Sequence, residues 1–333
     1  MERSAKIYVA GHTGLVGSAL VRRLQTGGYS RLLLRSHSQL DLTDCRAVCQ
    51  FLQTERPEYI FIAAAKVGGI LANSTYPADF IRQNLVIATN VIHEAYGSGV
   101  KRLVFLGSSC IYPKHAPQPM KEEYMLTGPL EPTNRSYAVA KIAGIEMCWG
   151  YNRQFGTCFL GAMPTSLFGP GDRYDLDTSH VIPALLRKMH EAKVNGATEV
   201  VVWGSGTPRR EFLYSDDAAD ACVFLMNLAQ EQLEKILSED AIPPIVNVGC
   251  GQDITIRELA EMIAEIVGFQ GRLVYDHSKP DGTPRKLLNV DRLTALGWVP
   301  RISLREGLRN AFQDFSKNIA PHAHRDSVST KLR

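Results

Sequence analysis

Gly11-His12-Thr13-Gly14-Leu15-Val16-Gly17 is the stretch that decides the fold. An apolar run, Ala5–Ala10, precedes it and predicts a β-strand. A periodic run, Leu15–Gln25, follows it and predicts a helix that stops at Gly27-Gly28. Glycines at such a junction let the backbone turn tightly and approach a pyrophosphate, which then sits at the helix N-terminus. The spacing is G-x-x-G-x-x-G rather than the commoner G-x-G-x-x-G, and a lone glycine triplet is often a simple turn. Because it stands at the first strand-to-helix junction, we interpret it as a dinucleotide-binding loop.

The residues that follow alternate between short apolar runs and longer amphipathic ones. This alternation predicts an α/β fold built on a Rossmann-type doubly wound parallel sheet with helices on both faces. Strands are expected at residues 31–34, 59–65, 102–107 and 158–163, and helices at 44–54, 77–96 and 137–155.

After Pro164 the pattern changes to loops rich in Gly, Pro and Asp between short elements. We expect helices at 181–191, 216–228 and 256–267, and strands at 199–203, 245–248 and 271–275. The sequence therefore predicts a smaller, mostly C-terminal α/β substrate lobe on a discontinuous boundary. The expected division is a cofactor-binding domain at 1–164 with returning segments at about 212–248, a substrate lobe at 165–211 and 249–316, and a polar tail at 317–333.

The composition is that of an ordinary globular chain: 333 residues, 45% hydrophobic and 21% charged. A formal net charge of +3 with scattered basic residues argues against a nucleic-acid partner. The seven Cys form no C-x-x-C pair and the nine His are dispersed, so no metal site or disulfide framework is expected. Neither an apolar run of membrane-spanning length nor a signal-peptide pattern is present, so we expect no membrane contact and a cytoplasmic location.

The segment Tyr137-Ala138-Val139-Ala140-Lys141 places a Tyr and a Lys one helical turn apart. An ammonium beside a phenol favours the phenolate, so we expect Lys141 to lower the pKa of Tyr137 from about 10 toward neutrality. Such a Tyr suits proton transfer to a ketone that receives hydride.

The segment Gly107-Ser108-Ser109-Cys110, about thirty residues earlier, ends a predicted strand. Ser108 and Ser109 each carry a hydroxyl that could bind a carbonyl, and composition does not separate them. Plain ketone reduction does not need the thiol of Cys110. A Cys after a strand is most often a small buried hydrophobe, so Cys110 by itself does not indicate a catalytic function.

The end of the second predicted strand bears on the choice of cofactor. NAD-binding units place an Asp or Glu there, whereas this chain has Arg35. Arg35 suits a 2′-phosphate and favours NADPH, although it could also be an ordinary surface residue. Asp41, a few residues later, is expected either to cap the next segment or to contact the adenine.

The order of the glycine loop, Ser108, Tyr137 and Lys141 resembles the extended short-chain dehydrogenase/reductase superfamily. Longer strings narrow the resemblance to the GDP-L-fucose synthase family, over about residues 5 to 315. They are Ala63-Ala64-Ala65-Lys66-Val67-Gly68-Gly69-Ile70, Gly107-Ser108-Ser109-Cys110-Ile111-Tyr112-Pro113-Lys114, Glu131-Pro132-Thr133-Asn134, Ser179-His180-Val181-Ile182-Pro183-Ala184-Leu185, Val202-Trp203-Gly204-Ser205-Gly206-Thr207-Pro208 and Lys279-Pro280-Asp281-Gly282-Thr283-Pro284-Arg285-Lys286.

The resemblance implies epimerisation of GDP-4-dehydro-6-deoxy-D-mannose at carbons 3 and 5, then NADPH-dependent reduction of the 4-keto group to give GDP-L-fucose. It implies that Ser108 bonds the substrate carbonyl, Tyr137 transfers the proton and Lys141 orients the nicotinamide ribose. Cys110 would be the base of the epimerisation and His180 the acid, with a reference pKa of about 6.5. Taken alone, His180 is equally compatible with a helix-start residue that has no role.

The resemblance also implies the binding residues and a homodimer, in which the helices at 77–96 and 137–155 pair with those of a second subunit. The residues expected to bind NADPH are Gly11, His12, Thr13, Gly14, Leu15, Val16, Gly17, Arg35, His37, Asp41, Leu42, Leu106, Gly107, Ser108, Lys141, Pro164, Thr165, Ser166, Leu167 and His180. Those expected to bind the GDP-sugar are Lys188, Trp203, Arg210 and Asp281. Each of these four is, by itself, compatible with a solvated charge or a packed aromatic.

Three positions depart from the family pattern. Thr13 stands where Arg is common, and His37 where a basic residue is common, so NADPH preference is expected to rest mainly on Arg35 and to be weaker. Ser166 stands where Asn is common and keeps hydrogen-bonding capacity.

The competing functions are a nucleotide-sugar 4,6-dehydratase, 4-epimerase or 4-reductase, and a non-catalytic NADPH-binding sensor. A dehydratase of this class carries an Asp-Glu pair where this chain has Ser109-Cys110.

Overall fold

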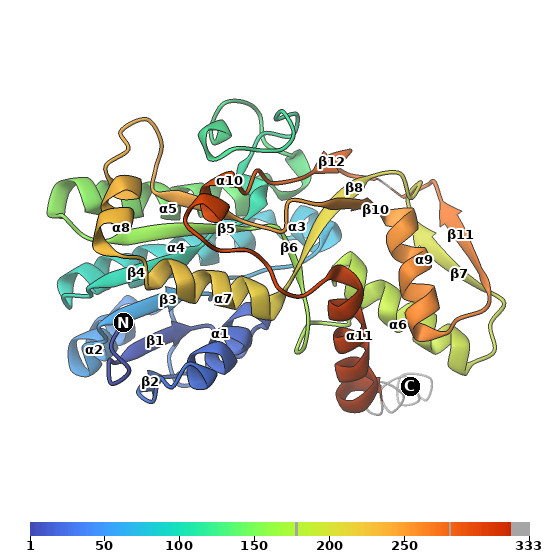
Figure 1. Ribbon diagram of the computed structural model, residues 1–333, viewed down its shortest axis with the longest axis horizontal. Helices are drawn as coiled ribbons and strands as arrows, with labels where there is room; N and C mark the ends of the chain where they lie inside the picture. The colour runs from blue at the N-terminus through green and yellow to red at the C-terminus, as the bar shows by residue number, and fades with distance from the viewer. Residues whose placement is uncertain (177–178, 280, 321–333) are drawn as a thin grey trace.

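The computed structural model describes residues 1–176, 179–279 and 281–320, and Figure 1 shows two lobes side by side. The larger lobe contains a six-stranded sheet in the order β2-β1-β3-β4-β5-β9, with every neighbouring pair parallel. The predicted Rossmann-type α/β fold is confirmed. The strands are β1 (Ile7–Ala10), β2 (Leu32–Leu33), β3 (Tyr59–Ile62), β4 (Arg102–Leu106), β5 (Phe159–Pro164) and β9 (Ile245–Val248).

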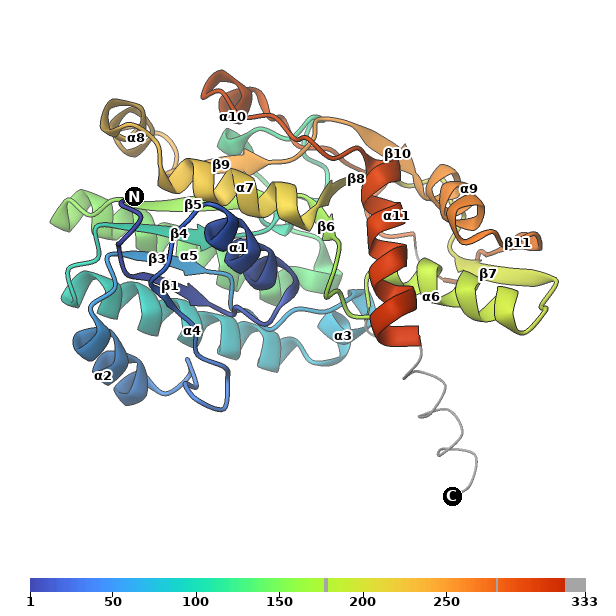
Figure 2. The same ribbon diagram turned by 60° about the horizontal axis from the view of Figure 1, so that its bottom comes forward.

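Helices cover both faces of this sheet, which is why its inner strands β1 and β3 are buried throughout and continuously apolar. One face packs against α1 (Leu15–Thr26), α7 (Ser215–Met226) and α8 (Gln230–Leu237). The other packs against α2 (Cys45–Glu55), α4 (Pro77–Gly97) and α5 (Arg135–Phe155), with the short α3 (Ile70–Thr75) before α4. Figure 2 shows α1 and α7 together on one side, and α4 and α5 on the other.

The smaller lobe has a third apolar core between short strands and three helices. β8 (Arg209–Tyr214) is its centre: it pairs with β10 (Asp253–Thr255), β12 (Arg285–Lys286) and β6 (Ser166–Phe168). β7 (Glu199–Trp203) pairs in parallel with β11 (Arg272–Asp276). The helices are α6 (Val181–Val194), α9 (Ile256–Val267) and α11 (Leu304–Asp314).

The chain passes between the lobes more often than the sequence indicates. The segment after β8 brings α7, α8 and β9 to the larger lobe. The segment around α10 (Asp291–Ala295) also returns: Leu293 and Trp298 lie in the core beneath α1 and α7, and Trp298 Nε1 donates to Asp220 Oδ2 at 2.9 Å. Assigning all of 249–316 to the substrate lobe is therefore wrong for this segment, because its apolar residues pack on the first sheet.

The predicted polar tail starts too early. A π-helical turn, Phe315–Ile319, continues from α11, and Ile319 and Ala320 pack against the core of the smaller lobe. Residues 321–333, which make up the rest of the predicted tail, lie outside the described residues.

Candidate active site

The end of β4 places two of the predicted catalytic residues. Gly107 follows the strand, and a Cβ there would lie 2.2 Å from Met163 Cε, so any side chain at this position would have to displace the end of Met163. Ser108 then caps a 3₁₀ turn, Ser109–Ile111, by accepting a hydrogen bond from the Cys110 backbone N–H at 3.3 Å. Ser108 and Cys110 therefore lie at the carboxyl edge of the parallel sheet, where ligands of such sheets bind.

The first turns of α5 bring Tyr137 and Lys141 to the same edge. The Tyr137 phenol has a hydrogen bond with the Ser108 side chain, whereas Ser109 is buried. Of the two hydroxyls that the sequence left open, the structure therefore joins Ser108 to the tyrosine. Lys141 Nζ donates to the Leu106 carbonyl at 2.7 Å and lies 5.8 Å from the centre of the Tyr137 ring.

Burial dominates the ionisation of this pair. It raises the pKa of Tyr137, the nearby Cys110 raises it further, and the hydrogen bond with Ser108 offsets only part of the increase. Burial lowers the pKa of Lys141 from 10.5 to about 7. The expectation that Lys141 brings the Tyr137 pKa toward neutrality is wrong for the chain without cofactor, because the loss of hydration disfavours both charged forms.

The Cys110 sulfur is surrounded by hydrogen-bond donors. Asn134 Nδ2 lies 3.1 Å from Sγ and Lys286 Nζ lies 3.7 Å from it. Asn134 Oδ1 is buried and has no hydrogen-bond partner among the described residues. Cys110 is half-buried, so the thiol is more accessible than the fully enclosed Cys148 and Cys222.

His180 comes from the smaller lobe, where it is the N-cap residue of α6. The residue as a whole is exposed, but the imidazole loses hydration against the surrounding protein, and this lowers its pKa from 6.5. A neutral imidazole at physiological pH can accept a proton from solvent and pass it on.

The glycine loop is shaped for a close approach of backbone and ligand. Gly11 has φ +81°, and a Cβ there would lie 2.7 Å from Ala64 Cα. A Cβ on Gly17 would lie 2.0 Å from the Gly11 carbonyl oxygen, so glycine is required for α1 to start this close to β1. No side chain caps α1, and among the described residues the buried His12 Nδ1 has no partner. Unpaired donors at a helix start fit the pyrophosphate of a dinucleotide.

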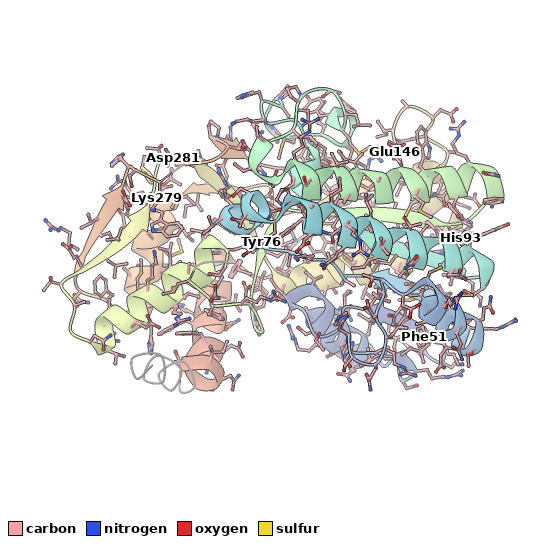
Figure 3. All side chains as sticks on the ribbon, turned by 180° about the vertical axis from the view of Figure 1, so that it is seen from behind. Phe51, Tyr76, His93, Glu146, Lys279 and Asp281 are labelled. Carbon is pink, nitrogen blue, oxygen red and sulfur yellow. The ribbon has the colours of Figure 1, made fainter. Side chains whose placement is uncertain are left out.

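The residues expected at the cofactor ribose have partners within the protein. Arg35 donates to Glu55 Oε1 at 2.9 Å and lies over Phe51, labelled in Figure 3, at 5.4 Å from the ring centre. His37 is 84% exposed, with Nδ1 3.8 Å from Asp41 Oδ1. Asp41 accepts from both the backbone N–H and the hydroxyl of Thr43 at 2.8 Å, which is a local turn, whereas the residue that caps the following helix α2 is Asp44.

The remaining cofactor candidates lie on neighbouring strand ends of the same edge. Leu106 ends β4, Pro164 ends β5, and Ser166 and Leu167 belong to β6. Thr165 is buried and donates from its hydroxyl to the Glu211 carbonyl at 3.1 Å. Leu42 lies apart from them, where its carbonyl accepts from Asn90 Nδ2 at 2.9 Å.

The four candidates for the GDP-sugar form two groups in the smaller lobe. Lys188 Nζ lies 4.9 Å from the centre of the Trp203 ring, which is 47% exposed. Arg210 donates to the Asp281 carbonyl at 3.4 Å, and the Asp281 carboxylate accepts from the Ser205 backbone N–H at 2.7 Å. Figure 3 shows Asp281 and Lys279 close together on this lobe. An exposed aromatic ring flanked by cations can hold a nucleotide base and its phosphates.

Comparison with known proteins places the chain. The profile of the NAD dependent epimerase/dehydratase family matches residues 7–249. The chain belongs to this family. It is 57% identical to GDP-L-fucose synthase 1 of Arabidopsis thaliana, over 96% of this chain and 95% of that protein. It is 55% identical to GDP-L-fucose synthase of Escherichia coli (strain K12), over 94% of this chain and 97% of that protein.

Solved structures agree with this placement. MlghC, a GDP-mannoheptose C4 reductase from Campylobacter jejuni with NADP bound, shares 38% identity and a TM-score of 0.86, over 95% of this chain and all of that one. A GDP-L-fucose synthetase from Naegleria fowleri bound to NADP shares 27% identity and a TM-score of 0.82, over 96% of both chains.

Two residues of the candidate active site were not predicted from the sequence. Asn134 and Lys286 both contact Cys110, yet both were quoted only as parts of longer strings. Lys286 lies 176 positions from Cys110 along the chain, so only the strand pairing of β12 could reveal the contact.

Among residues 1–176, 179–279 and 281–320, no group of His, Cys, Asp and Glu could hold a metal ion, and no helix is long and apolar enough to cross a membrane.

Proposed function

We propose that the chain is a GDP-L-fucose synthase, which converts GDP-4-dehydro-6-deoxy-D-mannose to GDP-L-fucose. The observation that carries this proposal is the accessible thiol of Cys110 beside the Ser108–Tyr137 pair. Reduction of a ketone needs only the hydroxyl pair and a hydride donor, whereas inversion of the neighbouring carbons needs an additional base. Identity of 55–57% to two GDP-L-fucose synthases over nearly the whole chain supports the same substrate.

The cofactor site fits NADPH. The unpaired donors at the start of α1 would hold the pyrophosphate, and Arg35 would approach the 2′-phosphate once it leaves Glu55. Lys141 would orient the nicotinamide ribose. NADPH supplies the hydride when it is bound.

Epimerisation uses the acidity of the protons on carbons 3 and 5, which lie next to the 4-keto group. Ser108 and Tyr137 hold the carbonyl oxygen and stabilise the enolate that forms when a proton leaves. Cys110 removes the proton on one face, and His180 supplies one on the other, so each centre is inverted. The lowered pKa of His180 makes its protonated form a ready donor.

Reduction then completes the reaction at carbon 4. Tyr137 stays protonated because burial raises its pKa, and it gives its proton to the alkoxide oxygen. Lys141, whose pKa is about 7, lies one helical turn away and is positioned to replenish that proton.

A second candidate is a GDP-sugar 4-reductase that does not invert its substrate. The similarity to the GDP-mannoheptose C4 reductase favours it. A 4,6-dehydratase lacks its acid pair here, because Ser109 and Cys110 occupy the two positions. A non-catalytic sensor would have no use for a thiol and a tyrosine at one carbonyl site.

One assay separates these candidates. GDP-4-dehydro-6-deoxy-D-mannose and NADPH are supplied to the purified protein, oxidation of NADPH is followed by absorbance, and the product is identified by NMR. We expect GDP-L-fucose. A product reduced at carbon 4 but not inverted at carbons 3 and 5 would favour the plain reductase, and no oxidation by folded protein would remove both.

The proposal includes a homodimer formed through α4 and α5. These two helices pack against each other, and Figure 3 looks onto them, with His93 on α4 and Glu146 on α5. Tyr96, Val139 and Phe155 are exposed on this pair, where a second copy would bury them. A cytoplasmic location and the lack of a nucleic-acid partner stay predictions.

A further inference from the structure

Lys286 has no role in the mechanism above, yet its ammonium group lies close to the proposed base. Its Nζ lies 3.7 Å from Cys110 Sγ, while Asn134 Nδ2 approaches the same sulfur to 3.1 Å from another side. Lys286 belongs to β12, which pairs in parallel with β8 so that Lys286 lies opposite Arg210.

These contacts favour one form of the sulfur over the other. An ammonium group and an amide nitrogen can only donate hydrogen bonds, so both contacts suit a thiolate, which only accepts. A cation within about 4 Å also stabilises a thiolate electrostatically.

The other charged and titratable groups around the sulfur do not oppose this effect. Arg210 interacts electrostatically with Cys110 and has the same sign as Lys286. Tyr137 faces Cys110 from α5 and remains neutral because burial raises its pKa. Glu131, which precedes Asn134, is paired with Lys114, with Oε2 3.0 Å from Nζ.

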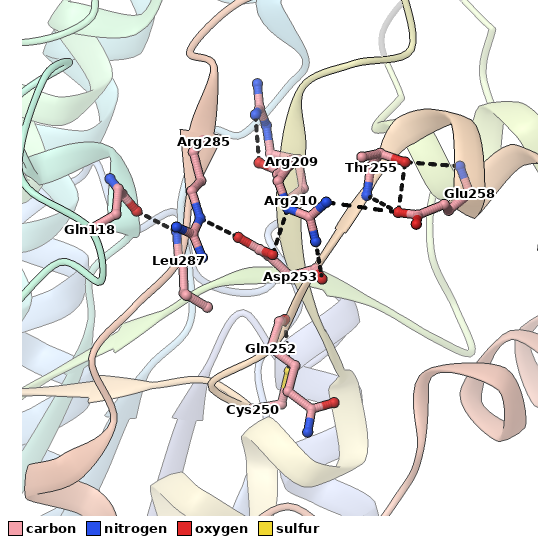
Figure 4. Close-up of polar contacts among 10 residues, drawn as sticks. All are labelled: Gln118, Arg209, Arg210, Cys250, Gln252, Asp253, Thr255, Glu258, Arg285 and Leu287. Atoms are coloured by element: carbon pink, nitrogen blue, oxygen red, sulfur yellow. Dashed lines mark hydrogen bonds and ion pairs between the residues drawn. The ribbon is translucent and has the colours of Figure 1, made fainter.

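The strand itself fixes the position of Lys286. Arg285 Nε donates to Asp253 Oδ2 at 2.5 Å, and the Leu287 backbone N–H donates to Gln118 Oε1 at 2.8 Å, as Figure 4 shows. The Leu288 backbone N–H donates to the buried Glu211 at 2.9 Å. Because side chains alternate along a strand, the pairing of Arg285 with Asp253 directs Lys286 to the opposite face, which is the face of Cys110.

We propose that Lys286 is a positioning residue that holds Cys110 as a thiolate, ready to remove a proton from the carbon beside the substrate carbonyl. In that step the sulfur takes the proton and becomes a thiol. The C–H electron pair moves into the enolate, whose oxygen Ser108 and Tyr137 hold. His180 then protonates the opposite face, and Lys286 stays protonated throughout. The inference rests on the proposed function for its reaction, but the state of the thiol is measurable without any substrate.

The first test measures how fast iodoacetamide alkylates Cys110 as a function of pH. The full chain is used without substrate or cofactor, and mass spectrometry of the Cys110 peptide separates it from the other six cysteines. The wild-type midpoint is expected below the ordinary value of about 8.5. In Lys286→Met it should rise by about one to three pH units, and in Lys286→Arg it should stay within about half a unit of the wild type.

Arg272→Met is the control, because it removes an exposed cation of the smaller lobe that pairs with Glu199 on β7 and is not part of β12. Its midpoint should equal that of the wild type. An unchanged midpoint in Lys286→Met, or an equal shift in Arg272→Met, overturns the proposal. So does a wild-type midpoint at or above about 8.5, which needs no variant to fold.

The second test follows solvent deuterium entering carbons 3 and 5 of GDP-4-dehydro-6-deoxy-D-mannose. Oxidised NADP is present, so no hydride can be transferred. At pH 7 the maximal exchange rate of Lys286→Met should fall about tenfold or more, in step with its thiolate fraction, and recover as the pH rises. A raised KM with an unchanged maximal rate would make Lys286 a substrate-binding residue and overturn the proposal. If the wild type exchanges no deuterium, the proposed function fails, while the alkylation profile still decides the state of the thiol.

Discussion

Without cofactor Lys141 is buried and Tyr137 is half-buried, and the loss of hydration keeps the phenol protonated while making the ammonium easier to deprotonate. The phenol is therefore the group whose proton the substrate oxygen can take. In Tyr137→Phe the ring remains and the proton donor is lost, so NADPH oxidation should fall by about 10²- to 10⁴-fold. Stopped-flow absorbance measures the rate, and fluorescence titration should show that NADPH still binds. A variant that oxidises NADPH at the wild-type rate would exclude Tyr137 as the donor.

Cys110 separates the two halves of the proposed reaction. A serine hydroxyl is a much weaker base than a thiolate, so Cys110→Ser should lose epimerisation more than reduction. We expect NADPH oxidation to continue and NMR to show a product that is not inverted at carbons 3 and 5. Normal GDP-L-fucose at a normal rate would show that another residue is the base.

Lys141 links activity to stability. Its pKa in the folded chain, about 7, lies below the unfolded value near 10.5, so the unfolded chain binds more protons between these pH values. This group therefore makes the free energy of unfolding rise with pH across that window. Lys141→Met should remove this part of the slope and, at pH 7, stabilise the cofactor-free protein by about 1–4 kcal/mol while abolishing activity. Urea unfolding at pH 7 and pH 9.5 measures both effects, and identical slopes in the two proteins would contradict the prediction.

At the scale of elements, β2 and α2 together determine how strongly the 2′-phosphate of NADPH is bound. β2 ends just before Arg35, and α2 ends at Glu55, which takes the Arg35 guanidinium. A 2′-phosphate must compete with that carboxylate. The ratio of kcat/KM for NADPH to that for NADH should fall about tenfold in Arg35→Ala, which corresponds to about 1.4 kcal/mol. In Glu55→Gln the ratio should rise, because the competing charge is gone. A strong NADPH preference that survives Arg35→Ala would refute this account.

The elements that the sequence predicts well are those with a strong internal signal. β3 is a continuous apolar run, and β4 is apolar after its first residue, Arg102. α9 begins with the capping box Thr255–Glu258 and has Gly268 as its C-cap, and its predicted range matches the observed one. β10 and β12 are short, and β8 begins with the charged residues Arg209, Arg210 and Glu211. Their formation depends on partners far along the chain, which no local pattern reports.

In the candidate site, too, the features with a local sequence signal are predicted and those that depend on distant residues are not. Four of the candidate residues come from the end of one strand and the first turns of the next long helix, so their spacing along the chain predicts that they meet. They are Ser108, Cys110, Tyr137 and Lys141. The effect of burial on the Tyr137 pKa and the contact between Lys286 and Cys110 arise from tertiary packing. Reasoning from neighbouring charges missed the Tyr137 effect because it takes no account of the lost hydration. It missed the Lys286 contact because the two residues lie 176 positions apart along the chain.

At the scale of the whole molecule, the exposed apolar face of α4 and α5 predicts the oligomeric state. The Tyr96 and Phe155 rings stack with their centres 4.3 Å apart, and both are more than a third exposed. Phe155→Lys places a charge on this face and should convert the dimer to a monomer in light scattering. Val299→Lys, at an apolar residue near α10 that is even more exposed, is the control and should leave the dimer intact. A monomeric wild type would remove the homodimer from the proposal.

The interleaving of the lobes also affects the order in which the chain acquires its structure during synthesis. Domains usually fold from the N-terminus as the ribosome releases them. Here the larger lobe gains its sixth strand only with residues 245–248 and its last core residues only with Leu293 and Trp298. Until then β5 is an open sheet edge on the nascent chain, able to pair with strands of other chains. The enzyme is therefore expected to need chaperone protection until almost all of it has been translated.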